Sequence, residues 1–236
     1  MSVTSNTSTP TAPGKAPPES TTLALMVVLT FVTGVVDSVG YLGLDRVFVG
    51  NMTGNIVILG MGLAGADELP VLGPAIALGA FSAAAFVAGL VLRTQPSGWT
   101  SRVSMCLAVG SAALVGCTIA IFVIDTSANT AGQLIIAAVT AATMGTQAAV
   151  ARKVGVKDMT TVVVTSTLTS LASESWMSGG GSALWNRRIG AILAILMGAV
   201  VGAIVLRHSH LGGAMGIAAA LTVAVTVIGH VRTDRR

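Results

Sequence analysis

Long apolar runs fill most of this chain from Leu23 onward, and they constrain its fold more than any other feature. Hydrophobic residues make up 53% of the 236 residues and charged residues only 9%, whereas about a quarter of an ordinary soluble domain is charged. A bilayer core about 30 Å thick requires about 20 apolar residues for each crossing helix. Runs of this length and number therefore predict an all-α, multi-pass membrane protein.

Eight apolar segments stand out, at 23–44, 46–64, 71–92, 103–124, 131–151, 159–173, 189–206 and 211–229. If all eight crossed the membrane, alternate loops would divide the thirteen Lys and Arg residues six to seven. If 46–64 and 159–173 instead return to the side they entered from, eleven lie on one side, and only Arg46 and Arg207 on the other. Such an excess marks the cytoplasmic side. The charges thus predict about six crossing helices, two polar re-entrant or broken segments, and cytoplasmic termini.

The remaining organisation follows from composition. Residues 1–21 are rich in Ser, Thr and Pro and contain no apolar core, so we expect a disordered cytoplasmic tail. Residues 22–232 read as a single polytopic membrane domain with halves of roughly 22–125 and 130–232. With three crossings each, the halves would run in opposite directions, as in the inverted repeats of many transporters.

Asp37 is the only ionisable side chain inside any long apolar run. A carboxylate in hydrocarbon costs several kcal/mol or becomes neutral, and it is usually tolerated only where it faces a bundle interior or a water-filled path. The other candidate ligands for a solute or ion are amides and hydroxyls in or just before the two polar segments: Asn51, Thr53, Asn55, Gln147, Thr165 and Thr167. The same groups could instead join helices by hydrogen bonds, so both interpretations stay open.

Two motifs resemble those of a known family. Asp37 late in the first helix, followed by the Asn-Met-Thr-Gly-Asn box at 51–55, resembles the YoaK-like family of bacterial integral membrane proteins, which is defined by a domain of unknown function. Gln147 and the Thr-rich run at 160–168 resemble the second-half motif, although Ala148 stands where that family usually has an Asn shortly after the Gln. The resemblance implies a six-helix membrane protein and brings no established activity.

We expect a transporter or permease of a small solute in the bacterial inner membrane, coupled to protons or cations through Asp37. One alternative is a scaffold or sensor that transports nothing. Another is a membrane enzyme using Asp37 as a general base, but only amides, hydroxyls and Tyr41 are available as a second reactive group. No catalytic motif appears, so we do not expect an enzyme.

The expected partners are the lipid bilayer and an unknown small solute. No cofactor or metal is expected, because the three His residues have no Cys or carboxylate at ligand spacing. The basic residues lie in loops and at the C-terminus, where they orient the chain in the membrane and do not indicate nucleic acid. Small-residue pairs at Gly198 and Gly202, or Gly212 and Gly216, would pack helices within one chain or between copies in a homo-oligomer.

Overall fold

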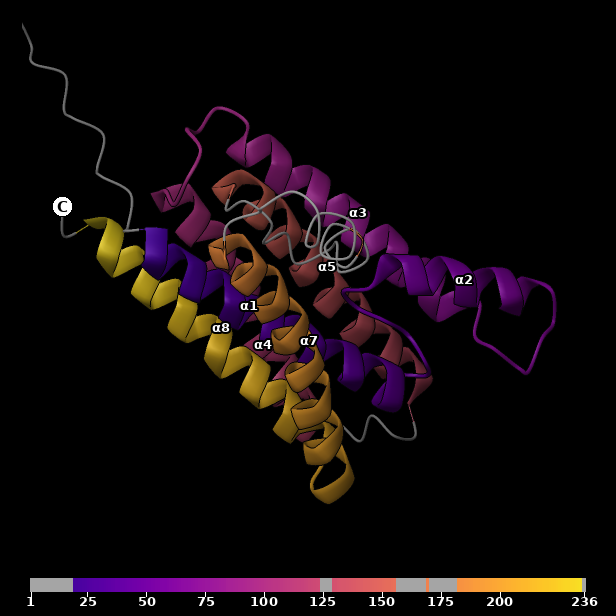
Figure 1. Ribbon diagram of the computed structural model, residues 1–236. Helices are drawn as coiled ribbons and strands as arrows, with labels where there is room; N and C mark the ends of the chain where they lie inside the picture. Colours follow the sequence, from indigo (N-terminus) through magenta and orange to yellow (C-terminus); the bar gives the residue numbers. More distant parts are fainter. Residues whose placement is uncertain (1–18, 124–128, 156–168, 170–181, 235–236) are drawn as a thin grey trace, which may run out of the picture.

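The computed structural model describes residues 19–123, 129–155, 169 and 182–234 (Figure 1). Within those ranges the chain forms seven α-helices and no strand. Six of the helices are long and apolar: α1 (Glu19–Gly43), α3 (Leu72–Leu92), α4 (Ser101–Val123), α5 (Thr130–Val154), α7 (Ser182–His208) and α8 (Leu211–Asp234). The shortest has 21 residues and reaches about 31 Å, which is enough to cross a bilayer core. The prediction of an all-α protein with about six crossing helices is confirmed.

The segment predicted at 46–64 contains one short helix, α2 (Met52–Leu63), preceded by irregular backbone. Its 12 residues extend only about 18 Å, too short to cross the hydrocarbon core. Helix α2 packs beside α3 and projects from the bundle at the end remote from the start of α1 (Figure 1). This part of the chain is therefore broken into a loop and a short helix; its return to the same side of the membrane stays a prediction, and the second such segment, 159–173, lies almost wholly outside the described residues.

The buried core has two layers, which show the direction of each helix. In one layer, Met26 near the start of α1 meets residues near the ends of α5 and α8, among them Val150 and Val225. In the other, Val36 from the later part of α1 meets Ala141 of α5 and the early part of α8. Successive long helices therefore alternate in direction, and α1 begins at the end of the bundle where α8 finishes (Figure 1).

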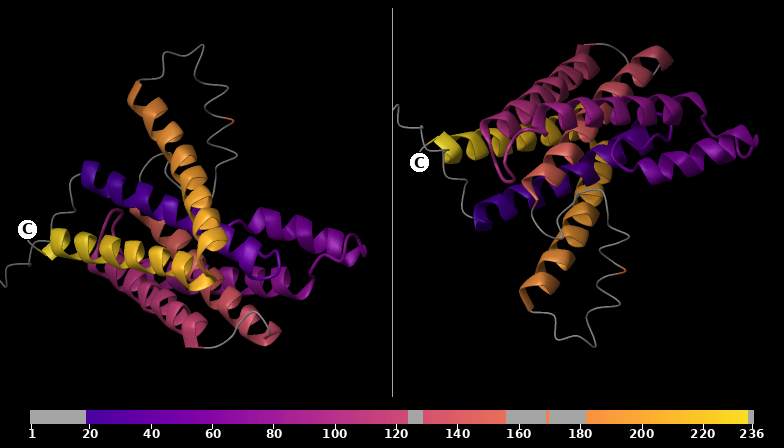
Figure 2. Two further views of the ribbon diagram at one scale, coloured as in Figure 1. Left: turned by 90° about the horizontal axis from the view of Figure 1, so that it is seen from below. Right: turned by 90° about the horizontal axis from the view of Figure 1, so that it is seen from above.

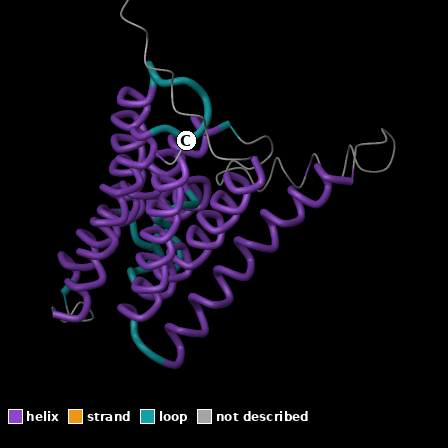
Figure 3. Tube along the Cα trace, turned by 90° about the vertical axis from the view of Figure 1, so that its left-hand side faces the viewer, coloured by secondary structure: helices purple, strands orange, loops and turns teal. Residues whose placement is uncertain are grey.

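The main contacts between long helices join one half of the chain to the other. Helix α1 packs mainly against α7 and α8, whereas α5 packs mainly against α3 and α4, and α4 packs against α8. The first long helix of each half thus lies against the last two of the other half. Helix α7 joins α8 by a short turn and diverges from the bundle toward its own start (Figures 2 and 3). This pattern agrees with an inverted repeat, which remains a prediction.

Glycines allow the two main helix crossings. A Cβ on Gly34 of α1 would collide with the carbonyl oxygen of Ile195 in α7, and one on Gly198 would collide with that of Phe31. In the other half, a Cβ on Gly145 of α5 would collide with the carbonyl oxygen of Phe81 in α3. Small residues at such points let backbones approach closely in membrane bundles. Gly198 therefore packs helices within one chain, which was one of the two readings of this glycine pair.

Candidate functional site

The polar site begins where the chain turns back after α1. Asp45 and Arg46 both adopt a left-handed φ of 58°, and the N–H groups of Leu44 and Val47 donate to the Gly40 carbonyl oxygen at 3.1 and 3.3 Å. The chain then runs back along the last turns of α1 as the loop 47–51, in which Val47 and Val49 are fully buried. Irregular backbone at membrane depth is tolerated only where protein or water satisfies its polar groups. The loop therefore needs acceptors for its N–H groups.

Asp37 supplies that acceptor. Its Oδ1 accepts hydrogen bonds from the backbone N–H groups of Val49 (3.0 Å), Gly50 (2.6 Å) and Asn51 (3.3 Å). The residue is only 8% exposed, and within the described part of the chain Oδ2 has no hydrogen-bond partner. Three N–H donors on one oxygen suit a carboxylate ion, whose hydrogen bonds are about twice as strong as neutral ones. Asp37 therefore connects α1 to the loop 47–51 and leaves one oxygen available.

Gly50 is required for this close approach. A Cβ at this position would lie 2.8 Å from Cγ2 of Thr33 and 3.4 Å from both carboxylate oxygens of Asp37. Any larger residue would push the loop away from α1 and lengthen the hydrogen bonds to Asp37. Neither Gly50 nor Thr33 was among the predicted site residues. Thr33 could have been found from its spacing, because residues four apart share a helix face and it lies one turn before Asp37.

The two Asn residues of the box at 51–55 also bind backbone. Asn51 is the N-cap of α2, and its Oδ1 accepts the N–H of Gly54 at 3.1 Å. Asn55 is fully buried; its Oδ1 accepts the N–H of Phe48 at 2.9 Å, and its Nδ2 donates to the carbonyl oxygen of the same residue at 2.5 Å. Thr53 is exposed in the first turn of α2. The box thus shapes the loop and starts α2.

Gln147 of α5 approaches the same face of α1. Its side chain is 2% exposed, and Nε2 donates to the carbonyl oxygen of Leu29 and to Oγ1 of Thr33, both at 3.1 Å. Its Oε1 is buried with no hydrogen-bond partner. Because Thr33 lies one turn before Asp37, the structure brings Gln147 close to the Asp37 site, linked to it through Thr33. Thr165 and Thr167, the other two predicted ligands, lie outside the described residues.

The predicted inverted repeat would pair Gly34 of α1 with Gly145 of α5, because each faces a carbonyl oxygen of a crossing helix. Asp37 follows Gly34 by three residues, and Ala148 follows Gly145 by three. On that prediction Ala148 is the counterpart of Asp37, and Gln147 lies one residue away from the matching position.

Three cavities, of about 640, 610 and 530 Å³, are lined by other parts of the described chain, and none of them includes Asp37. The backbone of the loop 47–51 lies directly against Oδ1 of Asp37. Oδ2 of Asp37 and Oε1 of Gln147 accept no hydrogen bond from the described residues.

Comparison with known proteins places the chain in a family. Residues 25–228 match the family described as "Protein of unknown function (DUF1275)". The UPF0700 transmembrane protein YoaK of Bacillus subtilis (strain 168) is 30% identical over 152 residues, a match that covers 64% of this chain and 65% of the Bacillus protein. No solved structure matches the chain. The resemblance to YoaK-like proteins is confirmed, and this multi-pass membrane protein therefore belongs to the DUF1275 family.

Proposed function

We propose that the chain is a transporter of a small solute in the bacterial cytoplasmic membrane, and that Asp37 carries the coupling proton. The observation that supports this most directly is the set of three loop N–H groups on one buried carboxylate oxygen. It links the protonation of one side chain to the position of a whole backbone segment at membrane depth. Intramembrane carboxylates are typical of proton relays in pumps and transporters.

The proposed step begins with the arrival of a proton on Asp37. A neutral carboxyl group accepts N–H groups more weakly than a carboxylate, so the loop 47–51 and α2 are held less firmly. Loss of the proton restores the charge and the three strong hydrogen bonds. Solute binding and release would alternate with these two states of the loop, and no catalytic step is involved.

Gln147 and Thr33 extend the polar surface from Asp37 along α1. The Oε1 of Gln147 is buried and has no donor, which is costly unless water or a solute supplies one. In the proposed transporter this oxygen binds a donor group of the solute or a water molecule beside it. Replacing Gln147 by Leu would then abolish transport with little change in stability, because Thr33 already donates to the Leu29 carbonyl oxygen.

The orientation in the membrane is proposed from charge. Helices α3, α5 and α8 finish at the end of the bundle where α1 begins, and this end carries Arg93, Arg152, Lys153 and Arg232. The opposite end carries Arg46 and Arg207. The end with more basic residues is assigned to the cytoplasm. The loop 47–51 then enters from the outer side.

A membrane scaffold or sensor is the second candidate. Its support is that the side-chain oxygen of Asn51 and the whole side-chain amide of Asn55 bind backbone groups of the loop and of α2. A sensor would use the same protonation of Asp37 to change the exposure of α2 without moving a solute. The two candidates differ in whether a solute flux exists.

The test uses proteoliposomes that contain a pH-sensitive dye and the purified protein. A panel of amino acids, sugars, nucleosides and organic acids is added outside, and internal pH is followed. We expect at least one solute to move protons through the wild type, and this coupled movement to disappear in Asp37→Asn but not in Asp45→Asn, which alters an exposed carboxylate. Equal proton movement in the wild type and Asp37→Asn would refute the coupling role. Absence of flux for every solute would favour the sensor.

A further inference from the structure

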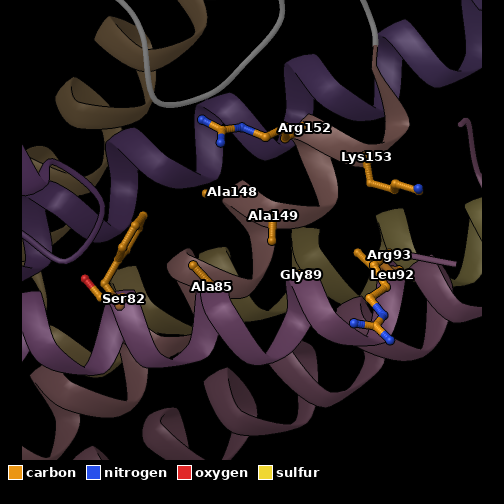
Figure 4. Close-up of a pocket in the computed structure, with 10 residues that line it drawn as sticks. Ser82, Ala85, Gly89, Leu92, Arg93, Ala148, Ala149, Arg152 and Lys153 are labelled. Carbon is orange, nitrogen blue, oxygen red and sulfur yellow. The ribbon is translucent and has the colours of Figure 1, made fainter. Parts of the chain in front are cut away.

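A cavity of about 640 Å³ lies between α3 and α5, toward the end of the bundle where both helices finish (Figure 4). Its lining divides into two kinds of surface. One is apolar and made of small side chains, including Ala85, Gly89 and Ala149. The other consists of the three basic residues Arg93, Arg152 and Lys153. The cavity therefore has an apolar wall and a cationic end.

The three basic residues come from the ends of two helices that pack against each other. Arg93 directly follows α3, whereas Arg152 and Lys153 lie in the last turn of α5. The N–H of Gly98 donates to the carbonyl oxygen of Lys153 at 3.4 Å, which joins the loop after α3 to the end of α5. Among the described residues that line the cavity, none is acidic. Within the described part of the chain, the cationic end thus has no balancing carboxylate in its lining.

This combination favours one type of ligand. Arg and Lys side chains bind phosphate oxygens, and basic pockets between membrane helices on the cytoplasmic side bind anionic lipid head groups. A free phosphate ion would neutralise the cations but would make no contact with the apolar wall. An anionic phospholipid satisfies both surfaces, because its phosphate reaches the cations while an acyl chain covers the apolar wall.

We propose that the cavity between α3 and α5 is a binding site for an anionic phospholipid, whose phosphate is held by Arg93, Arg152 and Lys153. The site does not use Asp37 or the loop 47–51, so it stands independently of the transport proposal. Its occupant would bridge α3 and α5 at the cytoplasmic end, where Arg93 and Arg152 are exposed.

Two matched pairs of variants test the two surfaces. Gly89→Leu fills the apolar wall, and Gly79→Leu is its control, because both glycines lie in α3 with no atom within 4 Å of an added Cβ and only Gly89 lines the cavity. Arg152→Gln removes one cation from the cavity. Arg232→Gln is its control, because it removes an exposed cation from the same end of the bundle without touching the cavity.

Lipid binding is measured by native mass spectrometry of the purified protein in detergent titrated with phosphatidylglycerol or phosphatidylcholine, with inorganic phosphate as a third arm. We expect selective retention of phosphatidylglycerol. Arg152→Gln should weaken it about fivefold, the ratio that corresponds to about 1 kcal/mol per basic side chain at an anionic lipid surface. Gly89→Leu should weaken it at least as much, and both control variants should behave like the wild type.

Other outcomes would overturn the proposal. Equal retention of phosphatidylcholine and phosphatidylglycerol would show that the cations do not select the head group. Equal weakening by Arg152→Gln and Arg232→Gln would indicate a diffuse surface charge effect. Displacement of the lipid by inorganic phosphate at similar concentration would assign the cations to a free anion. If Gly89→Leu does not fold, the Arg pair alone decides.

Discussion

Replacing Asp37 by Ala should free the loop 47–51 from α1, and the structure allows the size of the effect to be calculated. The substitution removes the shared acceptor of three N–H groups, two of which, on Val49 and Gly50, belong to buried residues. A buried donor without a partner costs about 1–3 kcal/mol, so these two together cost about 2–6 kcal/mol. The N–H of Asn51 belongs to an exposed residue and has the longest of the three bonds, so it can turn to water.

The change to Asn is the necessary comparison. Both substitutions remove the charge and therefore relieve the same cost of burying a carboxylate, whereas Asn keeps an oxygen that can accept the loop N–H groups. The difference between Asp37→Ala and Asp37→Asn thus isolates the missing acceptor. At tenfold for every 1.4 kcal/mol, a difference of about 2 kcal/mol corresponds to about 30-fold faster local opening in the Ala variant.

Hydrogen–deuterium exchange in detergent micelles measures this opening. The peptide spanning residues 47–55 should exchange about 30-fold faster or more in Asp37→Ala than in Asp37→Asn. Peptides from the middle of α4 should be unchanged, and Asp45→Asn should match the wild type throughout. If the Ala and Asn variants exchange within threefold of each other in a loop that is protected in the wild type, Asp37 does not hold the loop and the proposed coupling loses its physical basis.

Three further predictions follow from the same structure. Asn55→Ala should lower the free energy of unfolding by about 2–4 kcal/mol, because the backbone N–H and carbonyl oxygen of Phe48 lose their partner. Asn51→Ala, which removes an exposed helix cap, should lower it by only about 1 kcal/mol. Equal shifts of the two variants in thermal unfolding in detergent would contradict this. Gly145→Ala should lower the unfolding temperature and the yield of folded protein, since its methyl group would meet a carbonyl oxygen of α3; wild-type stability would refute that crossing. A cysteine replacing Asp67 should react with an impermeant maleimide in intact cells, whereas one replacing Ser97 should react only after permeabilisation, and the reverse would invert the proposed orientation.

The structure revises the predicted role of the Asn-Met-Thr-Gly-Asn box at 51–55. Asn51 and Asn55 were candidates for solute ligands or for hydrogen bonds between helices. The structure assigns their hydrogen bonds to backbone: one caps α2 and the other binds both backbone groups of Phe48. Their role is closer to the second interpretation, although the groups they join belong to one loop. Asp37 and Gln147 each keep one oxygen that accepts no hydrogen bond from the described residues.

Several properties could be predicted from the sequence because they depend on local composition alone. The length of an apolar run determines whether a helix can cross the bilayer, so the six crossing helices were predictable. Arg and Lys in loops indicate which runs do not cross, and α2 is indeed too short to do so. The exceptional position of Asp37 was equally evident, because a single carboxylate in an apolar run is conspicuous without any knowledge of its neighbours.

Only the tertiary structure decided which groups meet. Hydrogen-bond partners depend on which segments packing brings together, so no local pattern showed that Asp37 binds three N–H groups of the returning loop, or that Gln147 reaches Thr33 across 114 positions. The same holds for the cationic cavity: Arg93 and Arg152 were recognisable as orienting charges, but they line one cavity only because α3 packs against α5. The separation of two residues along the chain does not predict whether their side chains meet. These residues meet because α3 and α5 pack closely at Gly145.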